Sequence, residues 1–154
     1  MITATPFERL FLGGIRDAIG LSASNKLQIK TAINVSMEKT EPRSTGLTYV
    51  QIPLPDGEVV APWVLERVLM AIARHIRTGR LLVHCGAGMS RSVAIASLYL
   101  HIVGYAEYGE ALAAMARVRE VDVSPAMQRS VEKYLQNLAR EGSNESSHSR
   151  KPSG

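Results

Sequence analysis

Residues 80–92 read RLLVHCGAGMSRS, and this stretch decides the predicted fold. Arg80–His84 is a short apolar run of the kind that forms a buried strand. It passes directly into a glycine-containing loop, residues 85–91, and then into an apolar segment, residues 92–103, that predicts a buried helix. A strand, a tight loop and a helix in this order form a phosphate-binding arrangement. A ligand site is therefore expected at the carboxyl end of the strand.

The loop combines three chemical properties that no other part of the chain offers together. Its successive N–H groups can point inward as a nest for an anion, and Gly86 and Gly88 permit the backbone angles that such a loop needs. Cys85 lies at the positive end of the following helix, where the field favours a bound phosphate or a thiolate. Arg91 supplies a planar guanidinium that can bind two phosphate oxygens. The alternative is that a lone cysteine is a small buried packing residue.

Outside this stretch, strands are expected first along the chain and helices later. The expected strands are apolar, β-branched or aromatic and cover residues 10–12, 31–35, 47–52 and 80–84. The expected helices run from Ser22 or Ser24 to about Lys30, from Pro62 to near Gly79, and over residues 92–103, 107–119 and 124–140. The prolines and the glycine of IPLPDGE predict an irregular loop before the second helix.

The composition excludes several kinds of site and partner. At 154 residues, the chain fits one domain that needs no disulfide bonds, and its single cysteine excludes an intrachain disulfide and a cysteine-rich zinc site. The net charge of +4 is scattered and aromatic residues make up only 5%, so nucleic-acid binding is unsupported. The sequence has no uncharged apolar stretch of about 18 residues and no signal-peptide pattern. We therefore expect no membrane span and a cytoplasmic protein.

The end of the chain differs from the rest in composition. Residues 142–154 read GSNESSHSRKPSG and include no apolar residue. Such a segment buries too little surface to offset the entropy cost of ordering, so it is predicted to be a disordered tail. Residues 1–141 are expected to form the folded domain.

The segment His84–Ser92, HCGAGMSRS, resembles the signature loop of the cysteine-dependent protein tyrosine phosphatases, and its Ala-Gly-x-Ser-Arg-Ser form resembles the dual-specificity branch. Other stretches are similar to that family too: LFLGGIRDA, TAINVS, YVQIPLPD, SLYL and REVDVSP. The similarity runs from about residue 8 to about residue 140. It implies an α/β fold in which a central twisted mixed sheet of about four to five strands is flanked by helices. It also implies that residues 1–141 are a stand-alone catalytic domain.

The resemblance implies a two-step hydrolysis of phosphotyrosine and phosphoserine or phosphothreonine in proteins, without a metal or other cofactor. Cys85 would attack phosphorus and form a cysteinyl phosphate, which water then hydrolyses, while Arg91 and the loop amides bind the phosphate. The loop residues with this binding role would be Gly86, Ala87, Gly88, Met89, Ser90 and Arg91. Ser92 would help the thiolate leave, or it is a plain helix cap, and His84 would orient the loop. Phosphate-like oxyanions should inhibit such an enzyme.

This mechanism also needs a general acid for the leaving group, and the chain has three aspartates. Asp17 lies near a predicted helix start as a cap, and Asp122 is expected to face solvent. That leaves Asp56, in the IPLPDGE loop 29 residues before Cys85, and the family places its acid in this loop at a similar spacing. Asp56 is therefore the predicted acid, with Glu58 in reserve. The alternative is that Asp56 only forms the turn in Pro-Asp-Gly.

Other functions stay open. The loop's variable positions carry no charge, which disfavours, without excluding, a phosphatase for phosphoinositides, RNA 5′-triphosphate or another small phosphate ester. A non-catalytic phosphoprotein-binding module would lack a nucleophile, arginine or acid, and an arsenate reductase would need a second thiol. Arg117 and Arg119 are either solvated surface arginines or contacts to a second substrate phosphate. The sequence leaves the oligomeric state open.

Overall fold

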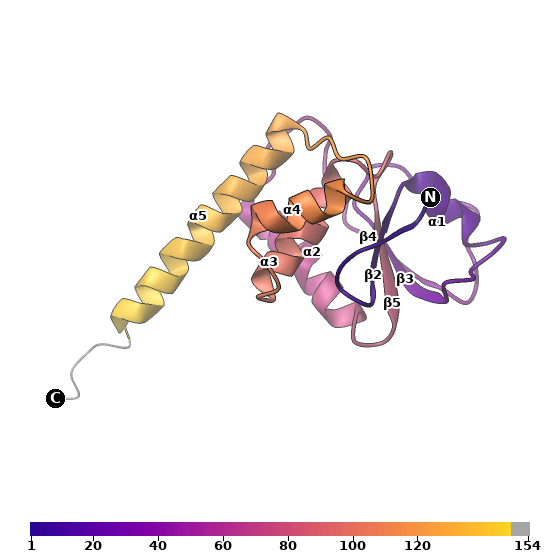
Figure 1. Cartoon of the computed structure of the whole chain (residues 1–154), viewed down its shortest axis with the longest axis horizontal. Helices are drawn as coiled ribbons and strands as arrows, with labels where there is room; N and C mark the ends of the chain where they lie inside the picture. The colour runs from indigo at the N-terminus through magenta and orange to yellow at the C-terminus, as the bar shows by residue number, and fades with distance from the viewer. Residues whose placement is uncertain (149–154) are drawn as a thin grey trace.

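A computed structural model describes residues 1–148 of the chain, and Figure 1 shows its arrangement. A single sheet runs through the middle of the molecule. Its strands are β1 (Thr3–Ala4), β2 (Leu10–Gly13), β3 (Ile29–Asn34), β4 (Thr48–Gln51) and β5 (Arg80–His84). The helices are α1 (Ile15–Gly20), α2 (Pro62–His75), α3 (Arg91–Ile102), α4 (Tyr108–Ala116) and α5 (Pro125–His148).

The sheet has the strand order β1-β2-β5-β3-β4. β1 pairs antiparallel with β2, and the other neighbouring strands are parallel. The predicted mixed sheet of four to five strands is therefore confirmed. Every residue of β5 after Arg80 is buried, because helices cover the faces of parallel strands. The carboxyl ends of β2, β5 and β3 lie in register, since Gly13 and Asn34 both pair with His84.

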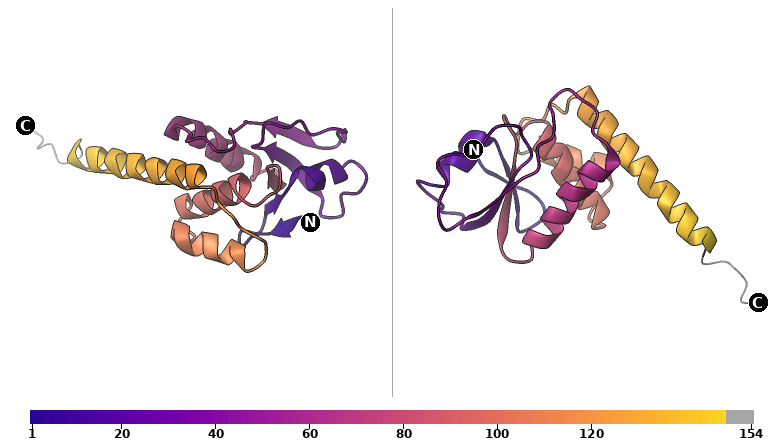
Figure 2. Two further views of the ribbon diagram at one scale, coloured as in Figure 1. Left: turned by 90° about the horizontal axis from the view of Figure 1, so that it is seen from above. Right: turned by 180° about the vertical axis from the view of Figure 1, so that it is seen from behind.

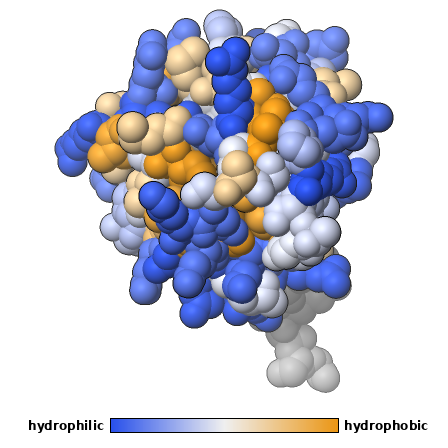
Figure 3. Space-filling view, turned by 90° about the vertical axis from the view of Figure 1, so that its right-hand side faces the viewer, coloured by the Kyte–Doolittle hydropathy of each residue, from blue (hydrophilic) through white to orange (hydrophobic). Residues whose placement is uncertain are grey.

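The helices divide between the two faces of the sheet. Figures 1 and 2 show α2, α3, α4 and α5 on one face and the short α1 on the other. α3 is central among the four helices and buries every residue from Ser92 to Leu100, as expected for a helix that is apolar all round. The side of the molecule that carries α1 is largely hydrophilic, with only narrow apolar strips (Figure 3). The strand, loop and helix predicted around residues 80–103 are thus β5, the phosphate loop and α3.

The prediction of a helix from Ser22 or Ser24 to about Lys30 was wrong, because no helix forms there. The structure instead places α1 earlier, at Ile15–Gly20, and begins β3 at Ile29. Both side-chain atoms of Asn25 bond to the backbone of Ile29 at 2.9 Å, and Gln28 has a φ of 56°. A side chain that bonds the nearby backbone and a left-handed residue both stop a helix from forming.

The end of the chain also differs from the prediction. α5 continues to His148, so residues 142–148 are helical although the sequence predicted disorder from 142. Extending an existing helix adds a hydrogen bond per residue without a new nucleation cost, which explains the extension through a polar segment. Residues 149–154 lie outside the described residues, and the division at residue 141 stays a prediction. Within the described residues, no helix is both long and apolar enough to cross a membrane.

Candidate active site

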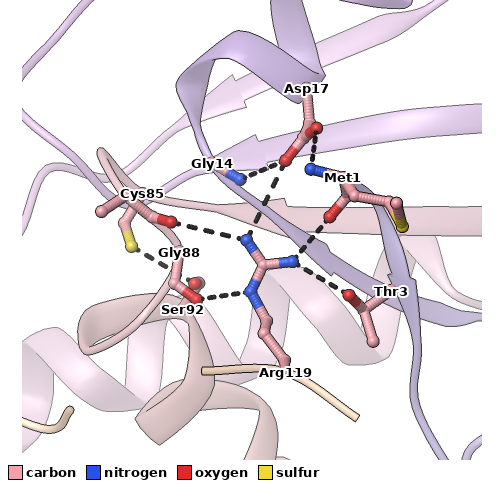
Figure 4. A network of polar contacts seen from close by, with 9 residues as sticks. Met1, Thr3, Gly14, Asp17, Cys85, Gly88, Ser92 and Arg119 are labelled. Atoms are coloured by element: carbon pink, nitrogen blue, oxygen red, sulfur yellow. Dashed lines mark hydrogen bonds and ion pairs between the residues drawn. The ribbon is translucent and has the colours of Figure 1, made fainter. Parts of the chain in front are cut away.

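The thiol of Cys85 lies just beyond β5, at the carboxyl edge of the sheet. Its side chain is buried, and its Sγ is 3.2 Å from the Oγ of Ser92, in the first turn of α3. Figure 4 shows this pair beside the loop. The fully buried Ser92 hydroxyl is therefore in position to donate a hydrogen bond to a thiolate.

The backbone carbonyls of residues 86–90 all accept hydrogen bonds. Gly86 O accepts from Ile15 N–H at 2.8 Å, and Met89 O accepts from Asp122 N–H at 2.9 Å. The carbonyls of residues 87 and 88 accept from the side chain of Arg119, and that of residue 90 accepts from residue 94 inside α3. Among the hydrogen bonds of residues 1–148, none is donated by an N–H of residues 86–90. A loop with bonded carbonyls and free N–H groups is a nest for an anion.

Arg119 holds the outer side of this loop (Figure 4). Its Nε donates to Gly88 O at 2.7 Å and its Nη2 to Ala87 O at 3.4 Å. Its Nη1 donates to Met1 O at 2.7 Å and to Thr3 Oγ1 at 3.0 Å, and the side chain is only 12% exposed. Arg119 therefore fits neither alternative offered by the sequence, a solvated arginine or a substrate contact. Arg117 is exposed.

Asp17 completes the outer support. It is a helix cap, as predicted, although it caps α1 and not a helix that starts at Ser22 or Ser24, since its Oδ2 accepts from Gly14 N–H at 2.8 Å. Its carboxylate also lies 2.7 Å from the amino nitrogen of Met1 and 4.0 Å from Nη2 of Arg119. Burial raises the pKa of Asp17, but the hydrogen bonds from Met1 and Gly14 and the charge of Arg119 outweigh it and hold the pKa below its ordinary value.

Close packing explains two of the glycines around the loop. Gly88 has a φ of +76°, and a Cβ there would lie 2.7 Å from Gly13 O. A Cβ at Gly14 would lie 2.7 Å from Gly86 O. The β2–α1 turn and the loop therefore approach each other closely enough that side chains at these positions would collide.

His84 lies inside the fold, directly before the loop. It is fully buried, and its Nε2 is 3.5 Å from Oγ1 of Thr40. Burial lowers the pKa of His84 to about 4, so the imidazole is neutral at pH 7. It directly precedes Cys85 in the chain and does not open to the surface, and its role in orienting the loop stays a prediction.

Arg91 links the loop to the segment that carries Asp56. Its Nη1 donates to Leu54 O at 3.0 Å. Its Nη2 lies beside Gly86, 3.5 Å from where a Cβ would stand on that residue. The guanidinium is thus held over the start of the phosphate loop, where a fork of donors can reach a bound anion.

The segment with Asp56 is held at both ends and exposed between them. Leu54 N–H donates to Val35 O at 3.0 Å, and Val60 N–H donates to the buried Ser130 Oγ on α5 at 2.8 Å. Asp56 is exposed, as is Glu58. The anchored ends fix where the exposed Asp56 is presented.

A pocket of about 340 Å³ brings the predicted acid to the predicted nucleophile. Its lining residues are Asp56, Cys85, Ala87, Met89, Ser90, Asp122, Ser124 and Pro125. Asp122 is exposed, as predicted, but it shares the pocket with Cys85, which sequence reasoning missed. Of the described residues, Glu58 is not among those that line the pocket.

The match to a known family is extensive. The family model described as dual specificity phosphatase, catalytic domain, matches residues 10–137. The chain belongs to this family. Dual specificity protein phosphatase 18 of mouse is 38% identical over 91 residues, which cover 53% of this chain and 47% of that protein. Dual specificity protein phosphatase Mpk3 of Drosophila melanogaster is 32% identical over 120 residues, which cover 75% of this chain and 29% of that one. The chain spans about half the length of the mouse relative.

Solved structures of the family share the fold. The crystal structure of human DUSP28 has a TM-score of 0.79 and 24% identity, over 92% of this chain and 99% of that one. A mouse dual specificity phosphatase complexed with zinc tungstate has a TM-score of 0.74 and 26% identity, over 87% of this chain and 86% of that one. The family resemblance and the fold class inferred from the sequence are both confirmed.

Proposed function

We propose that this dual specificity phosphatase domain hydrolyses phosphotyrosine and phosphoserine or phosphothreonine in proteins through a phosphate carried on Cys85. The observation that carries the proposal is the loop, in which free N–H groups of residues 86–90 adjoin a thiol that contacts the Ser92 hydroxyl. Membership of the family supports the same reaction.

In the first step, the Cys85 thiolate attacks phosphorus, an S–P bond forms and the bond from phosphorus to the ester oxygen breaks. Asp56 gives its proton to the departing oxygen, so a neutral hydroxyl leaves. Arg91 and the loop amides bind the other phosphate oxygens as their charge rearranges. The amides need no reorganisation, because the outer hydrogen bonds of the loop already fix their direction.

In the second step, water attacks phosphorus and the S–P bond breaks, which releases inorganic phosphate. The Asp56 carboxylate accepts the proton of the water. Ser92, with its Oγ 3.2 Å from the sulfur, donates to the thiolate as it leaves. No other reactant enters, and the enzyme returns to its starting state.

The proposal extends to inhibitors and location. A nest of N–H groups binds tetrahedral oxyanions as well as phosphate esters, so vanadate, tungstate and phosphate should compete with substrate. The related mouse phosphatase complexed with zinc tungstate supports this expectation. A reactive free thiol favours action in a reducing compartment, which we propose is the cytoplasm.

Turnover of a chromogenic aryl phosphate tests the proposal. Cys85→Ser should abolish turnover while vanadate binding stays measurable, because the loop amides remain. Turnover retained by Cys85→Ser contradicts the nucleophile assignment. A single preparation should then be assayed on phosphotyrosine and phosphothreonine peptides and on a phosphoinositide. Faster turnover of the phosphoinositide would overturn the protein substrate class.

A further inference from the structure

A second carboxylate stands in the catalytic pocket besides the proposed acid. Asp122 lines the same pocket as Asp56 and Cys85. Its backbone is attached to the phosphate loop, since Asp122 N–H donates to Met89 O at 2.9 Å. Two residues later, the N–H of Ser124 donates to the Oγ of Ser90, in that loop, at 3.0 Å. The backbone at Asp122 is thus fixed against the phosphate loop, and its side chain lines the pocket that Cys85 also lines.

The charge of Asp122 is unbalanced. The ion pairs of the described residues involve Asp17 and Glu107, and none involves Asp122. The pocket lining includes no lysine or arginine, and Arg119 donates to Gly88 O on the outer side of the loop. Asp122 therefore adds a carboxylate that is unpaired within the described residues, besides that of Asp56, to the pocket that a substrate enters.

A fixed carboxylate at this place acts on whatever flanks the phosphate. It attracts an ammonium or guanidinium group, and it repels a second phosphate, which carries a charge of about −1.5 to −2 at pH 7. A solvent-exposed ion pair of this kind changes affinity by about 2- to 5-fold, and salt screens it.

We propose that Asp122 makes the pocket select phosphorylated protein segments with a basic residue next to the phosphoresidue, and reject substrates with a second phosphate there. This inference rests on the proposed phosphatase function and specifies the substrate class of the same site. It assigns to Asp122 a role in specificity, separate from proton transfer.

The test compares kcat/KM for three phosphotyrosine peptides of one sequence that carry Arg, Glu or phosphoserine at the position beside phosphotyrosine. The wild-type protein should prefer the Arg peptide over the Glu peptide by about 2- to 5-fold. It should discriminate more strongly against the phosphoserine peptide, and salt near the molar range should suppress both preferences. Asp122→Asn should bring the Arg:Glu ratio close to one, and Asp122→Lys should reverse it.

Glu120→Gln is the matched control, because Glu120 is an exposed carboxylate that lines a neighbouring groove with Met1 and Val118. It removes the same charge and should leave the ratio at the wild-type value. A ratio of one in the wild type, or a preference that survives Asp122→Asn, overturns the inference. If the Asp122 variants do not fold, the salt dependence of the wild-type Arg:Glu ratio remains as the test. A ratio that salt near the molar range does not lower overturns the inference.

Two outcomes separate this inference from the proposed function. No turnover of the aryl phosphate or of any peptide would overturn both. Turnover without any preference for flanking charge would overturn only the role of Asp122. If Asp122→Asn lowers the turnover of alkyl phosphates far more than that of aryl phosphates, Asp122 is the general acid, and both the specificity role and the assignment of Asp56 are wrong.

Discussion

The inner and outer faces of the phosphate loop are served by two arginines with different tasks. Arg91 is half-buried and, among the described residues, its side chain donates only to Leu54 O, which leaves most of its donors for an anion. Arg119 lies outside the loop and uses its donors on Gly88 O, Ala87 O and the N-terminal segment. The inner N–H groups of the loop can stay free for an anion because the carbonyls on its outer face are hydrogen-bonded, and Arg119 supplies the donors for two of them.

Replacing the inner arginine should have the largest effect on catalysis. Arg91→Lys keeps the charge but removes the planar fork, so kcat/KM for an aryl phosphate should fall by about 10²- to 10³-fold. The midpoint of thermal unfolding should change little, because the side chain of Arg91 makes a single hydrogen bond within the described residues. A large loss of stability with little loss of turnover would make Arg91 a structural residue.

Replacing Arg119 should have the opposite emphasis, with a large loss of stability. Arg119→Met leaves two loop carbonyls without their donor, so the free energy of unfolding should fall by about 3 kcal/mol, measured by urea denaturation. Vanadate should bind less tightly, because the N–H groups lose their fixed direction. The matched control is Arg117→Met, which removes the same charge from an exposed position. If the two variants behave alike, Arg119 does not support the loop.

The sequence predicts the inner face of the site much better than the outer face. Cys85, Arg91 and the glycines stand within one short segment, and the apolar run of β5 places that segment at the edge of the sheet. Arg119 meets Asp17 and the loop only through the tertiary fold, and no local pattern in a single sequence marks such a contact. From its position in the sequence, after α4, Arg119 cannot be told apart from an arginine on the solvated surface.

Two further differences have the same origin. The helix expected before Lys30 does not form, because the side chain of Asn25 bonds the backbone of Ile29. This contact depends on how the chain turns into β3. Asp122 was correctly predicted to be exposed, but its place in the pocket follows from the hydrogen bond between its N–H and Met89 O. Periodicity predicts elements, and the packing of loops decides which exposed residues meet.

The buried imidazole next to Cys85 gives a smaller effect that depends on pH. The folded pKa of His84 is about 4, below the ordinary value of 6.5, so the unfolded chain binds more protons between these values. Stability should therefore fall as the pH drops through this window, by about 2 kcal/mol between pH 7 and pH 5. Urea denaturation should show this loss in the wild type and a smaller one in His84→Asn. Equal losses would mean that His84 is not the group responsible.

The central claim is that Cys85 carries the phosphate during turnover, and trapping that intermediate tests it most directly. Ser92→Ala removes the hydroxyl 3.2 Å from the sulfur, so the second step should slow and the intermediate should accumulate. Acid quenching during turnover of an aryl phosphate, followed by peptide mass spectrometry, should find one phosphoryl group on the peptide that contains Cys85. The same treatment of Cys85→Ser should find none. Continued turnover by Ser92→Ala with no adduct on Cys85, or with an adduct on another residue, would contradict the account.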